Sequence, residues 1–222
     1  MRPPRVIEIG AGTGALTAHL LERVPEVIAI ELDPRLADEL RRRFPARAGL
    51  TVVEADVLAT DLAKWGPAVV AGNLPYYITS PVIEKVLGMG PLLLGAVLLV
   101  QKEVAERLTA APGTRDYGWL TVATQLLADA EILFGVPPSA FAPPPRVESA
   151  VVRLAPRIRA DLEDREGFLD FARLCFRHKR KTLRNNLTPA YGRAAAELPE
   201  GSRRAEQLSV EELIALYARL RQ

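Results

Sequence analysis

Short apolar runs alternate with amphipathic segments along the first two thirds of the chain. The runs are rich in β-branched residues and are bounded by glycine, proline or acidic residues, which is typical of buried strands. They lie at Arg5–Ile9, Glu26–Glu31, Leu50–Glu54, Pro67–Gly72 and Gly95–Gln101. The segments between them have helical periodicity and lie at Ala15–Arg23, Pro34–Phe44, Ser80–Leu87 and Lys102–Ala110. This alternation predicts an α/β fold in which a parallel sheet carries helices on both faces.

The pattern changes toward the C-terminus. A further helix is predicted at Trp119–Ala130, and two strands, Glu131–Phe134 and Ala150–Leu154, flank a proline-rich loop. This late pair suggests that antiparallel strands extend one edge of the parallel sheet. Only charged helical segments follow, so we predict one domain over 1–156 and a small helical domain over 157–222. The helices of the second domain are predicted at Gly167–Phe176, Lys181–Leu187 and Val210–Leu220.

Composition agrees with a folded, globular chain. Of its 222 residues, 49% are hydrophobic and 25% are charged, which excludes a disordered or fibrous protein. The single cysteine, Cys175, cannot form an internal disulfide, and the longest apolar run, Pro91–Val100, is about half a membrane span. We therefore expect a soluble, cytoplasmic protein that does not act at a membrane.

Positive charge is concentrated in the predicted second domain. Residues 1–156 hold 15 lysines and arginines against 17 acidic residues, whereas residues 157–222 hold 14 against 10. Most of this excess lies in one short cluster, which consists of Arg177, His178, Lys179, Arg180, Lys181 and Arg184. Such a density suits contact with a phosphate backbone. A solvated helix face is the alternative interpretation.

A glycine-rich segment follows the first predicted strand and opens a helix. Gly10, Gly12 and Gly14 permit positive φ angles and close approach of a ligand to the main chain, while the helix presents unpaired amides. The spacing is not that of a dinucleotide loop, and no Gly-Lys-Ser/Thr follows to hold a triphosphate. Phosphate is therefore not the favoured ligand. A tight turn between strand and helix is the structural alternative.

Acidic residues mark the ends of the next strands. Glu31 ends the second strand, where a carboxylate can accept hydrogen bonds from both ribose hydroxyls, and Asp56 follows the third, where it can accept from an adenine amine. Asp33 competes for the ribose, but Pro34 indicates that Asp33 begins the next helix. Glu8, inside an apolar strand, can hold the glycine loop or face a cationic group. This acid-rich cradle favours S-adenosylmethionine over a dinucleotide.

The fourth strand ends in Asn73-Leu74-Pro75-Tyr76-Tyr77. An exocyclic adenine amine is a poor nucleophile because its lone pair is delocalised. The Asn73 oxygen and a main-chain carbonyl near Pro75 can accept both amine hydrogens, so that the lone pair points at an electrophilic methyl group. Tyr76 and Phe141, the latter held by three consecutive prolines, can stack on the two faces of a flipped-out base. A plain turn and a core phenylalanine are the alternatives, and no metal is expected.

In these motifs the chain resembles the ribosomal RNA adenine dimethyltransferase family. The resemblance covers nearly the whole chain from Arg5 onward. It is carried by Glu8–Gly14, Glu31, Glu54–Asp56, Gly72–Tyr76, Leu99–Glu103, Phe141–Ser149, Phe176–Leu187 and Arg204–Ser209.

The resemblance implies a Rossmann-like class I methyltransferase sheet and a helical tail that contacts RNA. The implied reaction transfers methyl groups from S-adenosylmethionine to two adjacent adenosines near the 3′ end of small-subunit ribosomal RNA. The partner would be a ribosomal subunit precursor and the protein a monomer. The implied cofactor site is Glu8, Gly10, Gly12, Gly14, Glu31, Asp56 and Asn73. Asn73, Pro75, Tyr76 and Phe141 would serve catalysis, and Arg177, Lys179, Arg180, Lys181 and Arg184 would bind RNA.

Two departures from the family pattern affect these expectations. Family members begin well before the first strand with a Gln-Asn/His-Phe-Leu segment that helps to close the cofactor pocket, so we expect weaker cofactor binding and an exposed sheet surface. Glu148 stands where aspartate is commoner, with little expected effect. A weakly active or non-catalytic ribosome-assembly factor, a small-molecule methyltransferase and a DNA adenine methyltransferase are the competing functions.

Overall fold

A computed structural model describes residues 3–45, 49–157 and 162–221. The chain divides into two compact units. The sheet unit consists of Met1–Ala105 and Ala128–Pro156, and the helical unit of Glu106–Leu127 and Arg157–Gln222. No helix within the described ranges is long and apolar enough to cross a membrane.

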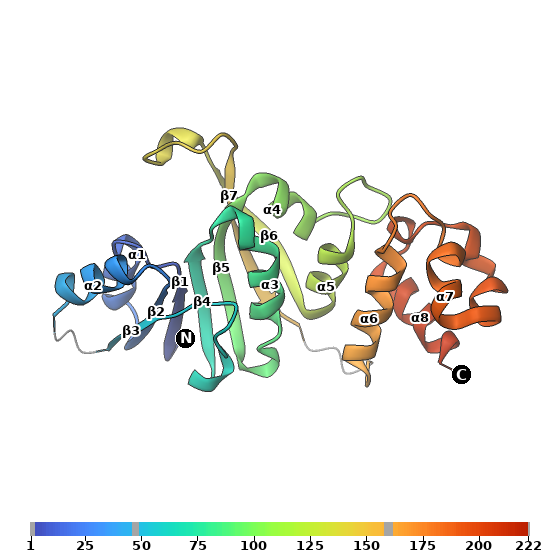
Figure 1. Ribbon diagram of the computed structural model, residues 1–222, viewed down its shortest axis with the longest axis horizontal. Coiled ribbons are helices and arrows are strands. Elements are labelled where there is room, and N and C mark those ends of the chain that lie inside the picture. Colours follow the sequence, from blue (N-terminus) through green and yellow to red (C-terminus); the bar gives the residue numbers. More distant parts are fainter. Residues whose placement is uncertain (1–2, 46–48, 158–161, 222) are drawn as a thin grey trace. The chain divides into compact units, whose positions relative to one another are not determined.

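The sheet unit contains seven strands in the order β3-β2-β1-β4-β5-β7-β6 (Figure 1). The first five pair in parallel, and β7 runs antiparallel to both of its neighbours, β5 and β6. The strands are β1 (Arg5–Ile9), β2 (Glu26–Glu31), β3 (Leu50–Glu54), β4 (Ala68–Asn73), β5 (Leu93–Gln101), β6 (Ala128–Val136) and β7 (Ser149–Pro156). The predicted mostly parallel sheet with a late antiparallel pair is thus confirmed, and the reversed strand lies second from the edge.

Four helices follow strands of this sheet: α1 (Ala15–Leu21), α2 (Pro34–Arg43), α3 (Thr79–Leu87) and α4 (Lys102–Leu108). Asp33 caps α2 as expected, since its Oδ1 accepts the Arg35 main-chain N–H at 2.9 Å and Pro34 takes the first helical position. The start of α3 was predicted wrongly at Ser80. It begins one residue earlier, after a 3₁₀ turn over Tyr76–Ile78, and no side chain caps it.

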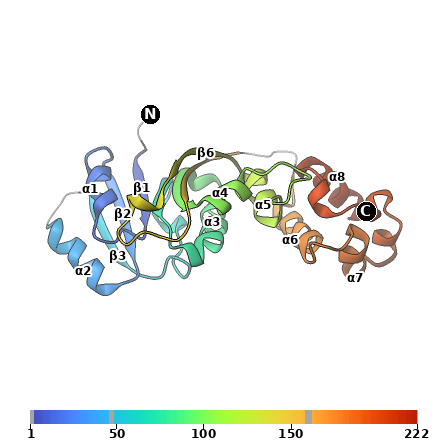
Figure 2. The same cartoon turned by 90° about the horizontal axis from the view of Figure 1, so that it is seen from above.

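A proline-rich loop joins β6 to β7 and projects from the end of the sheet, as the yellow segment in Figures 1 and 2 shows. Its first part forms a 3₁₀ turn over Pro138–Ala140, and Phe141 follows that turn in an extended conformation. The loop ends at Ser149, where β7 begins. Phe141 is therefore carried on a segment anchored by strands at both ends.

The helical unit is built from α5 (Trp119–Leu127), α6 (Arg165–Phe176), α7 (Leu183–Ala196) and α8 (Val210–Leu220). The sequence assigned Glu106–Leu127 to the first domain, but the contacts place this segment in the helical unit. The physical reason is burial: Tyr117, Val122 and Leu126 share one core with Phe168 of α6. The helix α7 continues past its predicted end, with a break in helical geometry at Gly192.

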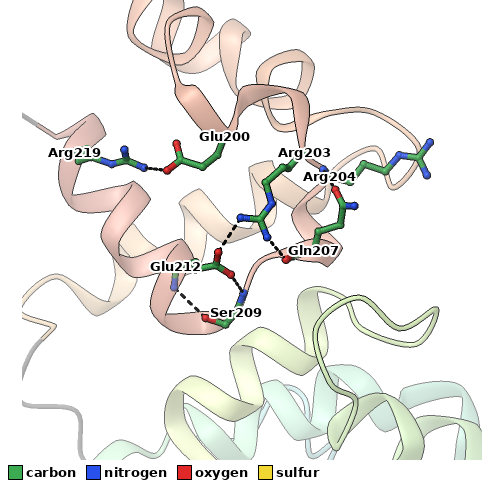
Figure 3. Close-up of polar contacts among 7 residues, drawn as sticks. All are labelled: Glu200, Arg203, Arg204, Gln207, Ser209, Glu212 and Arg219. Carbon is green, nitrogen blue, oxygen red and sulfur yellow. Dashed lines mark hydrogen bonds and ion pairs between the residues drawn. The ribbon is translucent and has the colours of Figure 1, made fainter.

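Ion pairs link α8 to the segment between α7 and α8, as Figure 3 shows. Arg219 contacts Glu200 at 2.6 Å, and Arg203 contacts Glu212 at 2.8 Å. Glu212 also forms a capping box with Ser209 at the start of α8. These two arginines therefore stabilise the helical unit itself.

Candidate active site

A hollow of about 530 Å³ lies at the carboxyl ends of the first parallel strands. We call it the acidic hollow. Neighbouring parallel strands end at the same edge of a sheet, so β1, β2, β3 and β4 bring the segments that follow them together here. Among the residues predicted for the site, Gly10, Glu31, Asp56 and Pro75 line it. The sequence analysis missed several other lining residues, namely Leu32, Val57, Tyr77 and Ile78.

The three glycines of the first loop differ in their surroundings. Gly10 has a φ of 70°, which favours glycine, and an added methyl group there would lie at an ordinary contact distance of 3.5 Å from the Asn73 main-chain oxygen. Gly12 faces open space and donates its N–H to Glu31 Oε2 at 2.8 Å. Gly14 has a φ of 83°, which favours glycine, and a methyl group there would come within 2.7 Å of the Leu40 side chain of α2. Gly12 and Gly14 are not part of the acidic hollow's lining.

Glu31 is held by main-chain donors. Only 8% of it is exposed, and its two carboxylate oxygens accept the N–H groups of Gly12 at 2.8 Å and Asp33 at 2.9 Å. Each carboxylate oxygen has two lone pairs, so Glu31 can still accept a hydrogen bond from a ligand hydroxyl. The carboxylate is thus oriented before any ligand arrives.

The charge of the acidic hollow decides which ligand fits. Three carboxylates line it, those of Glu31, Asp33 and Asp56, against one guanidinium, that of Arg35. Arg35 is itself paired with Asp33 at 2.7 Å, and the hydrogen bond lowers the pKa of Asp33 to about 2. Phosphate would therefore meet net negative charge. A ribose and a positively charged centre suit this lining, and the volume lies in the range of small-ligand pockets. The residues fit S-adenosylmethionine.

Glu8 joins the two sides of the glycine loop. It is 2% exposed, and its Oε2 accepts the Thr17 hydroxyl at 2.6 Å, which links β1 to α1. Burial raises the pKa of Glu8 to about 7. Glu8 does not line the acidic hollow. Of the two roles considered for Glu8, the geometry supports holding the loop.

Asn73 lies at the exposed end of β4 and lines a second hollow of about 570 Å³. We call it the apolar hollow, because aliphatic side chains from one face of the sheet form most of it. Phe141 of the proline-rich loop lines the same hollow. Val97 of the sheet and Leu16 of α1 are 40% and 39% exposed in this hollow. Asn73 stands two residues before Pro75, which lines the acidic hollow, and β1 and β4 pair up to Ile9 and Gly72, so the two hollows are neighbours at these strand ends.

Main-chain acceptors beside Asn73 are not equivalent. The Pro75 carbonyl already accepts the Ile78 N–H at 3.1 Å and the Thr79 hydroxyl at 3.2 Å, so it is committed to the turn. Leu74 donates its N–H to Leu99 at 3.0 Å. Among the residues described, we find no donor to the Leu74 carbonyl. Of these two carbonyls, that of Leu74 is therefore the one open to a ligand.

The two tyrosines after Pro75 differ in exposure. Tyr76 is partly buried, its hydroxyl lies 2.6 Å from Ser149 Oγ, and it does not line either hollow. Tyr77 is 81% exposed and lines the acidic hollow. The sequence analysis missed both Tyr77 and Ser149, because adjacent tyrosines look alike in a sequence and a serine that begins a strand gives no signal.

All five predicted RNA-binding residues are exposed on the helical unit, in the loop after α6 and the first turn of α7. Lys179 Nζ donates to the Arg115 carbonyl at 2.5 Å, and the Arg184 guanidinium lies against Gly201. Asn186, 4% exposed, donates to the carbonyls of Cys175 at 2.7 Å and His178 at 3.2 Å and so holds this loop. The sequence analysis missed this holding role.

Comparison with known proteins agrees with this geometry. Residues 3–222 match a sequence model described as ribosomal RNA adenine dimethylase. The chain belongs to this family. It is 46% identical to ribosomal RNA small subunit methyltransferase A of Acidobacterium capsulatum, over 97% of this chain and 81% of that protein. The corresponding protein of Chlorobium phaeobacteroides is 42% identical over 97% of this chain and 80% of its own length.

Two solved structures of similar proteins extend the comparison. A dimethyladenosine transferase from Plasmodium falciparum superposes with a TM-score of 0.81 at 30% identity, covering 96% of this chain and 88% of that one. The 23S rRNA methyltransferase ErmE gives a TM-score of 0.74 at 31% identity, covering 100% of this chain and 92% of that one. The fold is therefore shared by a protein named as a dimethyladenosine transferase and by one named as a 23S rRNA methyltransferase.

Proposed function

We propose that this chain transfers methyl groups from S-adenosylmethionine to the exocyclic amines of two adjacent adenosines near the 3′ end of small-subunit ribosomal RNA, giving dimethyladenosines. The observation that carries the proposal is the position of Asn73, exposed at the junction of the acidic and apolar hollows. Relatives 41–46% identical over nearly the whole chain are named as small-subunit methyltransferases, which supports this target.

The acidic hollow would hold the cofactor. Glu31 would accept from the ribose hydroxyls, because main-chain N–H groups already orient its carboxylate. Asp56 would accept from the adenine amine, and Leu32 and Val57 would contact the ring. When bound, S-adenosylmethionine supplies an electrophilic methyl group on a positively charged sulfur. Gly10 would let that part of the ligand approach the main chain next to Asn73.

Asn73 and its neighbours would activate the target amine. The Asn73 side-chain oxygen and the Leu74 carbonyl would each accept one amine hydrogen, which draws the nitrogen toward tetrahedral geometry and localises its lone pair. Pro75, at φ −59°, fixes the turn that follows. No strong base is required, because the proton is lost to water after the nitrogen has become cationic. Alignment and pre-organised acceptors supply the rate enhancement.

Aromatic rings would hold the flipped-out base. Phe141 shares the apolar hollow with Asn73, and Tyr76 follows Asn73 closely in the chain. Stacking on an aromatic side chain contributes about 1–3 kcal/mol per base. The proline-rich loop limits the conformational freedom that Phe141 would lose on binding.

The helical unit would contact RNA through Arg177, Lys179, Arg180, Lys181 and Arg184. These side chains are exposed and follow the C-terminal end of α6, where cations are favoured. A ribosomal subunit precursor in the cytoplasm is the proposed partner, and a monomer the proposed active form. The positive excess of residues 157–222 supports this role.

A large-subunit target is the second candidate, because ErmE, named as a 23S rRNA methyltransferase, shares the fold at 31% identity. Unmethylated small subunits, large subunits and duplex DNA are incubated separately with the chain and radiolabelled S-adenosylmethionine. We expect label only in small-subunit RNA, recovered after digestion as dimethyladenosine. Label in the large subunit alone would favour the second candidate. Cofactor binding without labelling of any substrate would leave a non-catalytic assembly role.

A further inference from the structure

The hydroxyls of Tyr76 and Ser149 lie 2.6 Å apart although 73 positions separate them in the sequence. Ser149 is fully buried, at 0% exposed, whereas Tyr76 is only partly buried. A buried hydroxyl without a partner costs about 1–3 kcal/mol. The partly buried Tyr76 hydroxyl can bind water instead, but the buried Ser149 hydroxyl cannot. Ser149 is therefore the residue that depends on this hydrogen bond.

Ser149 occupies one of the most firmly fixed positions of the sheet unit. It is the first residue of β7 and pairs with Gln101 of β5 on one side and Val136 of β6 on the other. The residue before it, Glu148, accepts the Lys102 main-chain N–H at 3.0 Å and forms an ion pair with the Lys102 side chain at 2.6 Å. The oxygen that faces Tyr76 is therefore a rigid reference point.

The same strand end also carries the second aromatic residue. The proline-rich loop that holds Phe141 ends at Ser149. Rotation of Tyr76 about its Cα–Cβ bond would move the hydroxyl away from Ser149, so this contact fixes the direction in which the ring extends from the main chain. Rotation about the Cβ–Cγ bond leaves the hydroxyl oxygen in place, because that oxygen lies on the rotation axis. The positions of both rings therefore depend on the start of β7, that of Tyr76 through its hydroxyl and that of Phe141 through its loop. Stacking of a base depends on the position of a ring, so the hydroxyl contact acts on the function that Tyr76 would perform.

We propose that Ser149 is a positioning residue: its hydroxyl holds the ring of Tyr76 at the position where the target adenine stacks on it. This inference rests on the proposed function. Ser149 is 0% exposed and lines neither of the two hollows. It acts only through Tyr76, and this distinguishes it from a serine that merely completes the sheet.

A double-mutant cycle tests this dependence. Ser149→Ala, Tyr76→Phe and the double variant are assayed for kcat/KM on unmethylated small subunits. We expect each single variant to lose about three- to tenfold, as the net value of one hydrogen bond implies. The double variant should be no worse than either single variant. Multiplication of the two losses in the double variant would overturn the proposal. Ser149→Cys, which is somewhat larger than serine but forms only weak hydrogen bonds, replaces the alanine variant if that fails to fold.

A spectroscopic readout separates positioning from general destabilisation. An RNA carrying 2-aminopurine at the target position loses fluorescence when the base stacks on an aromatic ring. We expect Ser149→Ala to restore part of that fluorescence at saturating protein and cofactor, while Ser139→Ala, an exposed serine in the proline-rich loop, leaves the quenching unchanged. Equal quenching in wild type and Ser149→Ala would overturn the proposal. Absence of any methylation by the wild type would overturn the proposed function, and this inference with it.

Discussion

The charged side chains of the acidic hollow are held in place, whereas those of the basic loop, Arg177–Arg184 of the helical unit, are exposed. In the hollow, main-chain N–H groups fix both oxygens of Glu31, which is 8% exposed. In the loop, Arg180 and Lys181 are exposed, and no ion pair reaches them within the described part of the chain. Fixed, buried acceptors suit one small ligand of defined shape. Exposed cations suit a polyanion whose binding depends on charge and salt. The two regions should therefore fail in different ways when they are changed.

The largest loss is expected at the junction of the two hollows. Asn73→Ala removes one acceptor for the target amine and should lower kcat by about 10²–10³-fold, the range found for one pre-organised polar group. Cofactor affinity, measured by titration calorimetry, should change little, because Asn73 lines the apolar hollow and not the acidic one. A matched loss of cofactor affinity would show instead that Asn73 serves binding. Unchanged circular dichroism controls for folding.

The strands of the sheet unit were predicted well because apolar runs bounded by turn residues report burial directly. β1, β2 and β3 have the predicted limits. The edge strand β6 was predicted too short, since most of its residues are exposed and its apolar signal is weak. The assignment of Trp119–Leu127 to the first domain was wrong for another reason. An amphipathic helix shows that one face is buried, but not which core buries it.

Site residues were predictable where one motif stands at one strand end. Gly10, Glu31 and Asp56 converge because parallel neighbouring strands end together. Ser149 and Asn186 could not be found this way, because each works through a hydrogen bond to a group in another element, 73 positions away for Ser149 and 11 for Asn186. Gly14 is the opposite case: it belongs to the predicted motif, but it lies against α2 and does not line the acidic hollow.

The next largest effect is expected at Glu8, and it concerns the stability of the sheet unit that carries the acidic hollow. Burial raises the pKa of Glu8 to about 7, so the folded state holds this proton more tightly than the unfolded state does. The stabilising contribution is complete below about pH 4.5 and is lost as the pH rises through 7. Wild type should lose about 2–3 kcal/mol more than Glu8→Gln between pH 5 and pH 8. Urea denaturation at both pH values measures this, and parallel pH profiles would contradict it.

Glu31→Gln asks whether pre-organisation explains ligand binding at the acidic hollow. The amide group places an N–H₂ opposite a main-chain N–H, of either Gly12 or Asp33, so one hydrogen bond becomes a repulsion. We expect the Kd for S-adenosylmethionine to rise about tenfold or more, and the free energy of unfolding to fall by about 1–2 kcal/mol. Glu39→Gln, at an exposed position on α2, is the matched control and should change neither value. Equal effects at both positions would mean that net charge alone matters.

The smallest effect per residue is expected in the basic loop, and its form differs from the others. Arg180→Gln and Lys181→Gln should each weaken RNA binding a few-fold and reduce the slope of log K against log salt by about 0.7–0.9, as the loss of one phosphate contact does. Cofactor affinity should not change. Arg193→Gln is the matched control, because Arg193 is exposed on the same unit but paired with Glu197 at 2.6 Å. Filter binding between 50 and 200 mM salt measures all three variants. An unchanged slope for Arg180→Gln and Lys181→Gln would place the RNA-binding surface elsewhere. If Lys179→Gln weakens RNA binding more than Arg180→Gln or Lys181→Gln does, the hydrogen bond from Lys179 to the Arg115 carbonyl also maintains the shape of the RNA-binding surface.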